Sequence, residues 1–229
     1  CMEYFSRGLE LGNQVYMQYE VTGDSYKELK LKVLDMGMGQ ERNAWFTSGT
    51  STSYESTFPT VAKKLYAIAG IKPDDSIIGR FLPYSSYLNI DEVENIAAVW
   101  KDVAAKVGVG VQELQQHVLP LSQLYSVAEH ARTLLVALSD GVLPSNSAGG
   151  YNLRVLLRRA LMMIERNAWD INLADVCSWH AAYLKPQFPE LSEHLEDVKK
   201  VLAVEERKFA ETRKRSAASV EREVKKGIS

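Results

Sequence analysis

The chain has 229 residues, of which 46% are hydrophobic and 24% are charged, and its formal net charge is -2. This composition is typical of a globular protein with enough apolar residues for a core, and the charge excludes a globally basic nucleic-acid-binding surface. No run of residues approaches the roughly 18 apolar residues of a membrane span, so we expect no membrane partner. We expect no DNA partner either.

The two cysteines, Cys1 and Cys177, lie far apart in the sequence and predict no disulfide framework. That usage fits a reducing compartment and a cytoplasmic location. The chain opens on Cys1 and not on an initiator Met, and its first residues do not form a basic-then-apolar leader. We therefore expect it to be an internal piece of a longer protein.

Residues 9 to 35 show the period of two that is typical of β-strands. Alternation is clear over residues 14–19 and again over residues 29–34, and the Thr-Gly-Asp-Ser cluster at 22–25 between them is typical of a turn. The pattern predicts an antiparallel hairpin, followed by a helix that opens over residues 40–46.

Residues 55–107 are predicted to be helical in pieces, interrupted at three prolines: Pro59, Pro73 and Pro83. The acidic stretch 91–94 predicts a helix start, because carboxylates there offset the positive end of the helix dipole.

Two further helices are expected on either side of Pro120, the second stopping at Asp140 and Gly141. An arginine-containing helix follows over residues 151–166, and a long amphipathic helix over residues 190–226. The predicted fold is therefore mainly α, preceded by a short antiparallel β element, with domains at 1–50 and 51–229.

A first motif occupies residues 34–42, Leu-Asp-Met-Gly-Met-Gly-Gln-Glu-Arg. Gly37 and Gly39 would let the backbone lie against a ligand, while Arg42 could pair with phosphate or stack on a purine. Asp35, at the strand end, could neutralise an ammonium group. The residues alone predict either part of a binding site for ATP and an amino acid, or a glycine-rich turn with a solvated arginine.

A second motif is the Ser-Asn loop, residues 139–146, Ser-Asp-Gly-Val-Leu-Pro-Ser-Asn. The amide of Asn146 offers a donor and an acceptor together, which suits the reading of a base edge. Arg154 and Arg158 lie four residues apart on one face of the next helix, with Arg159 beside them, a spacing that suits successive phosphates. The alternative is a plain turn followed by a solvated arginine face.

Residues 34–42 resemble motif 3 of the class II aminoacyl-tRNA synthetases, in the form seen in alanyl-tRNA synthetases. Residues 8–18 resemble the strand that lines the alanine pocket of that family. The resemblance, nearest to the archaeal type, runs on through the Ser-Asn loop and the arginine helix to residues 205–212. It therefore covers nearly the whole chain and implies the end of a class II catalytic core joined to a helical tRNA-recognition domain.

The resemblance implies a role for individual residues of the N-terminal part. Arg42 would be catalytic through its contact with ATP phosphate, and Asp35 would hold the amino group of alanine. Asn13 would orient the amino acid, while Val15 and Gly37 would keep the pocket small.

For the C-terminal part, the resemblance implies that Asn146 reads the G·U wobble pair in the acceptor stem of tRNA(Ala), with Arg154, Arg158 and Arg159 on the phosphates. The implied function is part of an ATP-dependent alanine–tRNA ligase that uses alanine, tRNA, ATP and Mg2+. Motifs 1 and 2 of the family do not occur in the chain. We therefore expect the isolated chain to bind no cofactor, to need the remaining synthetase domains and not to aminoacylate alone.

Two other classes of protein stay open. One is a helical RNA-binding module without ligase activity, in which residues 37–42 form only a turn. The other is a protein-interaction scaffold that uses Leu195, Val198 and Leu202 of the C-terminal amphipathic helix. We predict no metal site, because Cys177 and His180 do not supply four convergent ligands.

Overall fold

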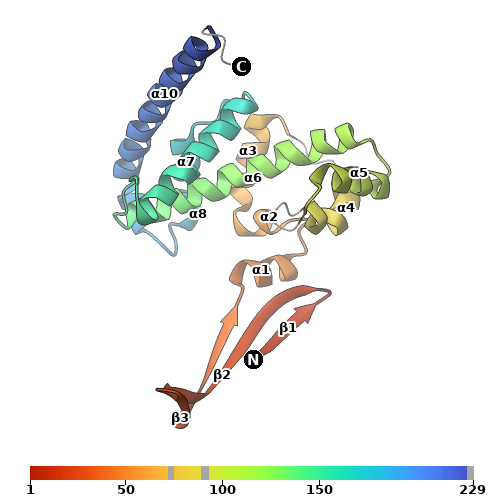
Figure 1. Ribbon diagram of the computed structural model, residues 1–229, viewed down its shortest axis with the longest axis vertical. Helices are drawn as coiled ribbons and strands as arrows, with labels where there is room; N and C mark the ends of the chain where they lie inside the picture. Colours follow the sequence, from red (N-terminus) through yellow and green to blue (C-terminus); the bar gives the residue numbers. More distant parts are fainter. Residues whose placement is uncertain (72–74, 89–92, 226–229) are drawn as a thin grey trace. The chain divides into compact units, whose positions relative to one another are not determined.

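The computed structural model describes residues 1–71, 75–88 and 93–225 (Figure 1). Contacts divide the chain into two compact units, Cys1–Pro59 and Thr60–Ser229. The first contains a three-stranded antiparallel sheet and two short helices, and the second is built from helices. This confirms the predicted mainly α fold with a short β element. Within the described ranges, no helix has the length and apolar character needed to cross a membrane.

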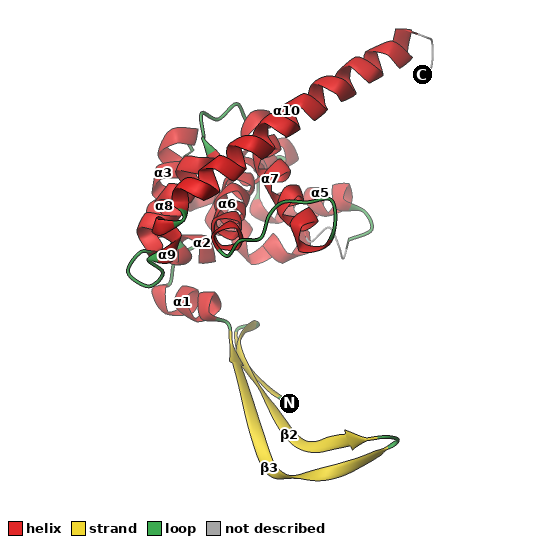
Figure 2. Cartoon of the chain, turned by 90° about the vertical axis from the view of Figure 1, so that its left-hand side faces the viewer, coloured by secondary structure: helices red, strands yellow, loops and turns green. Residues whose placement is uncertain are grey.

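The sheet has the order β1-β2-β3, and its strands are Met2–Ser6, Leu9–Thr22 and Ser25–Met38. Figure 2 shows β2 and β3 as two long strands joined at one end. β2 and β3 form the predicted hairpin, with Thr22 paired to Ser25. Gly23 in the turn has a φ of 60°, which L-residues rarely adopt. β1 was not predicted, and β3 runs on past the predicted end at residue 35 to Met38.

The faces of the sheet are open within the first unit. Gly12 is the single buried residue of the three strands, and large side chains such as Val21, Tyr26 and Leu31 are each at least 75% exposed. An exposed apolar surface of this kind marks an interaction site in a folded protein.

Two short helices, α1 (Gln40–Ser48) and α2 (Ser53–Thr57), complete the first unit. α1 begins where the sequence predicts. Asn43 ties its first turn to the sheet, because its Nδ2 donates to the carbonyl oxygens of Leu11 at 2.8 Å and Gly39 at 2.9 Å.

The helical unit continues through eight α-helices and one 3-10 helix over its described residues: α3 (Pro59–Ala69), α4 (Asp75–Phe81), η1 (Leu82–Leu88), α5 (Ile96–Val107), α6 (Val111–Ser139), α7 (Ala148–Arg166), α8 (Leu173–Leu184), α9 (Glu190–Glu193) and α10 (Leu195–Lys225). Pro59 opens α3, a position where its missing N–H costs no helical hydrogen bond. The predicted break at Pro73 lies outside the described residues.

The predicted start of α5 in the acidic stretch 91–94 is wrong. The helix begins at Ile96, and Asn95 caps it by accepting a 3.1 Å hydrogen bond at Oδ1 from the amide of Ala98. A side-chain acceptor at the cap satisfies an amide that has no partner inside the helix, so it decides the start. Asp91 and Glu92 lie outside the described residues.

The predicted pair of helices around Pro120 is also wrong, because α6 is one helix that contains Pro120. Buried side chains lie on both sides of the proline, among them Leu114, Val118, Leu121 and Leu124. Their packing offsets the hydrogen bond that the proline removes, a loss of about 3 kcal/mol in an isolated helix.

α6 runs through the middle of the helical unit, with α7, α8 and α10 against it (Figure 1). The amphipathic helix predicted at 190–226 is interrupted at His194, which separates α9 from α10. Val198 and Leu202 of α10 are at most 1% exposed and belong to the core, whereas every described side chain from Glu211 onward is exposed.

Candidate functional site

Four residues predicted to surround alanine lie together on one face of the hairpin. Across β2 and β3, Asn13 stands opposite Gly37 and Val15 stands opposite Asp35. Directly opposed residues of an antiparallel pair share a face, and so do residues two apart along a strand. The register therefore brings these four positions into a two-by-two group, which we call the hairpin group.

A side chain at Gly37 would displace the Asn13 amide from its present position. A Cβ at this position would lie 2.9 Å from Oδ1 of Asn13, closer than real Cβ atoms approach a neighbour. The missing side chain leaves room for the Asn13 amide on the shared face.

Glu10 links the hairpin group to Arg42, the predicted ATP-binding residue. Nη1 of Arg42 donates to Oε2 of Glu10 at 3.0 Å and to its backbone oxygen at 2.9 Å, while Nδ2 of Asn13 donates to Oε1 at 3.2 Å. The hydrogen bond from Arg42, followed by that from Asn13, holds the pKa of Glu10 below its ordinary value. We assigned no role to Glu10 from the sequence, because nothing near it along the strand indicates a partner 32 residues away.

The Ser-Asn loop starts from a helix stop that the sequence correctly placed at Gly141. This residue has a φ of 87°, and its amide donates to Leu138 at 3.1 Å while the amide of Val142 donates to Ala137 at 3.0 Å. These two bonds form a Schellman motif, which satisfies the last carbonyl groups of α6.

The end of the loop is held by Gly150, in the first turn of α7. The amide of Ser145 donates to the carbonyl oxygen of Gly150 at 3.0 Å. A Cβ at Gly150 would lie 2.4 Å from the backbone oxygen of Leu143, so the loop can approach α7 only because this residue is a glycine.

Asn146 is exposed, and Arg154 of α7 holds its side chain. Nη1 of Arg154 donates to Oδ1 of Asn146, and Nη2 donates to the carbonyl oxygen of Pro144 at 3.2 Å. Its Nε and Nη2 also donate to the two carboxylate oxygens of Glu205 in α10, at 2.9 and 3.2 Å. The side chains of Arg154 and Glu205 are 15% and 5% exposed, so their guanidinium and carboxylate groups lie inside the unit.

The other two predicted RNA-binding arginines have different surroundings. Arg159 is exposed, whereas Arg158 is half-buried, with its guanidinium carbon 5.7 Å from the centre of the Phe209 ring. Arg213 lies over the same ring at 5.9 Å. The phosphate-binding roles of Arg154, Arg158 and Arg159 stay predictions, and of these three Arg159 has the side chain most open to solvent.

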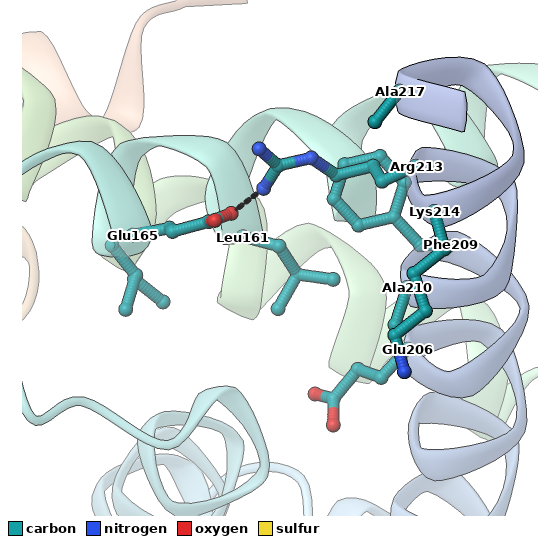
Figure 3. A pocket seen from close by; sticks show the side chains of 9 residues that line it. Leu161, Glu165, Glu206, Phe209, Ala210, Arg213, Lys214 and Ala217 are labelled. Atoms are coloured by element: carbon teal, nitrogen blue, oxygen red, sulfur yellow. Dashed lines mark hydrogen bonds and ion pairs between the residues drawn. The ribbon is translucent and has the colours of Figure 1, made fainter. Parts of the chain in front are cut away.

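A groove of about 620 Å³ lies between α7 and α10 (Figure 3). Arg213 pairs with Glu165 across it, and burial raises the pKa of Glu206 on its wall. It is lined by Leu161, Ile164, Glu165, Glu206, Phe209, Ala210, Arg213, Lys214 and Ala217.

Cys177 and His180 pack inside the helical unit against α6. Sγ of Cys177 lies 3.4 Å from the carbonyl oxygen of Ala131, and Nε2 of His180 donates to that of Ala128 at 2.9 Å. Burial raises the pKa of the Cys177 thiol to about 12, so it is neither a ready nucleophile nor a ready metal ligand. In the part of the chain that the structure describes, no three His, Cys, Asp or Glu residues group closely enough to hold a metal ion.

Comparison of the sequence with known proteins identifies a family. Residues 5–228 match the family described as tRNA synthetases class II (A), and an alanine–tRNA ligase from Methanocella arvoryzae is 43% identical over 225 residues. The chain belongs to the alanyl-tRNA synthetase family of class II.

Other relatives in this family are similar over the same extent. The alanine–tRNA ligases of Nitrosopumilus maritimus and Thermococcus kodakarensis are 37% and 33% identical, over 93% and 100% of this chain. The match covers 98% of this chain for the Methanocella arvoryzae protein. It spans 26%, 24% and 27% of the Methanocella, Nitrosopumilus and Thermococcus relatives, so the chain spans about a quarter of their length.

Proposed function

We propose that this chain forms part of an ATP-dependent alanine–tRNA ligase, contributing to the alanine and ATP site through its sheet and reading the tRNA acceptor stem through its helical unit. The observation that carries the proposal is the hairpin group, tied to Arg42 through Glu10, in a member of the alanyl-tRNA synthetase family. Residues that lie 20 or more positions apart in the sequence converge on one short piece of sheet.

The chemistry of the hairpin group suits a small amino acid. Asp35 is exposed and opposes Val15, so its carboxylate is available to pair with an ammonium group beside a short apolar side chain. Nδ2 of Asn13 donates a hydrogen bond to Glu10, which leaves Oδ1 of Asn13 as the acceptor turned toward Gly37. An acceptor and a carboxylate on one face can share the three N–H bonds of an α-ammonium group.

Arg42 is the residue of the chain that would contact ATP. A guanidinium beside the phosphates stabilises the charge that develops when the alanine carboxylate attacks the α-phosphorus and pyrophosphate leaves. Glu10 holds that guanidinium at one edge, so less side-chain freedom is lost on binding. Mg2+ enters the proposal together with ATP, because Mg2+ is usually bound through one or two carboxylates plus the phosphates of the substrate.

The exposed sheet supports a role within a larger enzyme. Val21, Tyr26 and Leu31 are at least 75% exposed, and an apolar surface of this extent is normally covered by further protein. In the proposed ligase the remaining synthetase domains cover it and supply the other contacts to ATP.

The RNA-reading part of the proposal rests on the exposed Asn146 at the end of a loop fixed by Gly141 and Gly150. A loop that is already ordered loses little entropy when it meets a base edge. Arg159, exposed on the next helix, supplies a positive charge for the RNA backbone. A cytoplasmic location, where tRNA is charged, completes the proposal.

Binding to acceptor-stem RNA tests the proposal directly. The chain is titrated with a duplex that carries a G·U pair and with the same duplex carrying G·C, at two salt concentrations. We expect a preference for G·U of about tenfold, as one base contact commonly provides, and its loss in Asn146→Ala. Equal affinity for the two duplexes in the wild-type chain would contradict the reading role.

The hairpin group needs its own measurement, because RNA binding does not report on it. In the longer protein that also contains the rest of the catalytic core, addition of a non-hydrolysable alanyl-adenylate analogue should shift the NMR side-chain signals of Asn13 and Arg42, and should do so less in Asp35→Asn. RNA binding without such shifts in that longer protein would favour the alternative of an RNA-binding module without ligase activity.

The alternative of a protein-interaction scaffold loses two of its three proposed contact residues. Val198 and Leu202 are buried in the core of the helical unit, so they cannot at the same time form an intermolecular surface. Polar substitutions there would lower the stability of the fold and would not report on self-association.

A further inference from the structure

Glu205 of α10 is a buried carboxylate with one partner on α7 and another on α10. Arg154 of α7 donates to both of its oxygens, and Nζ of Lys208 donates to Oε1 at 2.9 Å. Burial alone would raise the pKa of Glu205, but the hydrogen bonds from Arg154 and Lys208 bring it below the ordinary value. A buried ion pair of this kind adds little net stability compared with apolar packing, so its place next to an exposed loop calls for another reason.

The same Arg154 determines which way the Asn146 amide faces. A guanidinium carries only donors, so the atom of Asn146 that meets Nη1 must be the acceptor Oδ1. The two N–H bonds of Nδ2 then face away from Arg154. The donors of the arginine therefore decide which of the two amide atoms, Oδ1 or Nδ2, faces Arg154.

We propose that Arg154 and Glu205 are positioning residues for acceptor-stem reading: Glu205 holds Arg154, and Arg154 holds Asn146 so that it presents a hydrogen-bond donor to an acceptor atom on a base edge. This inference rests on the proposed function and deepens it. It also separates Arg154 from the phosphate contacts, because four hydrogen bonds already occupy its guanidinium within the protein.

Three substitutions test the chain of contacts. Arg154→Lys keeps the positive charge but cannot hold two carboxylate oxygens and the loop together. Glu205→Gln keeps the shape but turns one accepting oxygen into a donor that faces the guanidinium. Asn146→Asp keeps the acceptor that Arg154 binds and removes the outward donor, so the loop stays ordered while reading is lost.

The measured quantity is the ratio of the Kd for the G·C duplex to the Kd for the G·U duplex, together with the slope of log Kd against log salt. We expect each of the three variants to lower the ratio about tenfold. In Arg154→Lys and Glu205→Gln the salt slope is expected to stay within about 0.3 of the wild-type value, because no phosphate contact is removed.

Arg159→Ala is the matched control on the same helix. Because Arg159 is exposed, its loss should weaken both duplexes alike, leave the ratio unchanged and reduce the salt slope by about one. A ratio unchanged in both Arg154→Lys and Glu205→Gln overturns the inference. So does an Arg154→Lys variant that behaves like Arg159→Ala.

A second measurement is independent of RNA. The NMR order parameter of the Asn146 side-chain amide should fall in Arg154→Lys and in Glu205→Gln, while circular dichroism shows that both variants are folded. An Asn146 amide that is as rigid in these variants as in the wild-type chain overturns the inference. If one variant folds poorly, the other variant decides. A wild-type chain with no G·U preference overturns the proposed function as well, whereas intact preference in the variants overturns the positioning role only.

Discussion

At the residue scale, the two candidate sites use the same three residue types, but a different residue stands in the middle of each. In the sheet, Glu10 stands between Asn13 and Arg42, and it takes the donor of the amide. In the helical unit, an arginine stands between an asparagine and a glutamate, and it takes the acceptor of the amide. The first arrangement therefore leaves Oδ1 of Asn13 as the acceptor that the proposed alanine site would use, and the second leaves Nδ2 of Asn146 as the donor that the proposed RNA-reading site would use.

Gly150 allows a sharp test of how the Ser-Asn loop is held. We expect Gly150→Ala to lower the free energy of unfolding by about 2 kcal/mol, because the new Cβ would meet backbone atoms that cannot move aside easily. Urea denaturation measures the change.

Gly149→Ala is the matched control for that substitution. A Cβ at Gly149 meets nothing within 4 Å, so this variant should be stabilised by up to about 1 kcal/mol through helix propensity alone. Equal effects of the two substitutions would show that the loop does not depend on close approach at Gly150.

His180 should make the stability of the helical unit depend on pH. Burial lowers the pKa of His180 from 6.5 to about 4. Between pH 6.5 and pH 4, His180 is therefore protonated in the unfolded chain but neutral in the folded chain. The free energy of unfolding should therefore fall as the pH drops from 6.5 through 4. Urea denaturation at pH 7 and pH 5 should show a smaller difference in His180→Gln, and an undiminished difference would assign the effect to other groups.

At the element scale, the helix boundaries were set by contacts of different range. The stop of α6 at Gly141 needs only the local backbone, and the sequence predicted it correctly. The passage of the same helix through Pro120 needs buried side chains on both sides of the proline, and these are buried by packing against other helices of the unit. A local rule for proline predicted a break there, and tertiary packing overrode it.

Removal of the proline tests this balance. Pro120→Ala restores an amide that can donate to the carbonyl oxygen of Gln116, so we expect the free energy of unfolding to rise by about 1 to 3 kcal/mol. Ser122→Ala, exposed on the same helix, controls for helix propensity and should change it by about 0.5 kcal/mol or less. A loss of stability in Pro120→Ala would instead mean that the packing of α6 requires a bend at the proline.

At the scale of the whole molecule, the two units bury their apolar residues to different degrees. The helical unit has a full core, including Leu134, Leu157 and Leu202, each completely buried. The sheet leaves large side chains such as Tyr26 exposed, as expected for a surface that further protein covers. The chain spans about a quarter of the length of its relatives, and the proposed ligase uses both units inside that larger protein.

The sequence by itself determined what depends on neighbours along the chain: the hairpin around Gly23, the glycine stop at Gly141 and the start of α1. The sequence also indicated the family, because the two motifs occur in the order and at the separation typical of that family. The roles of the individual residues predicted for alanine, ATP and tRNA stay predictions.

Only the tertiary structure decided what the polar side chains face. Arg154 was predicted to bind an RNA phosphate, which stays a prediction; its ion pair with Glu205, 51 residues away on another helix, could not be predicted from the sequence. Glu10 acquires its place from Arg42, 32 residues away, and a carboxylate on a strand carries no local mark of such a partner. The physical reason is that backbone conformation follows local sterics and hydrogen bonds, whereas the direction of a charged side chain follows whichever opposite charge the packing of distant elements brings within reach.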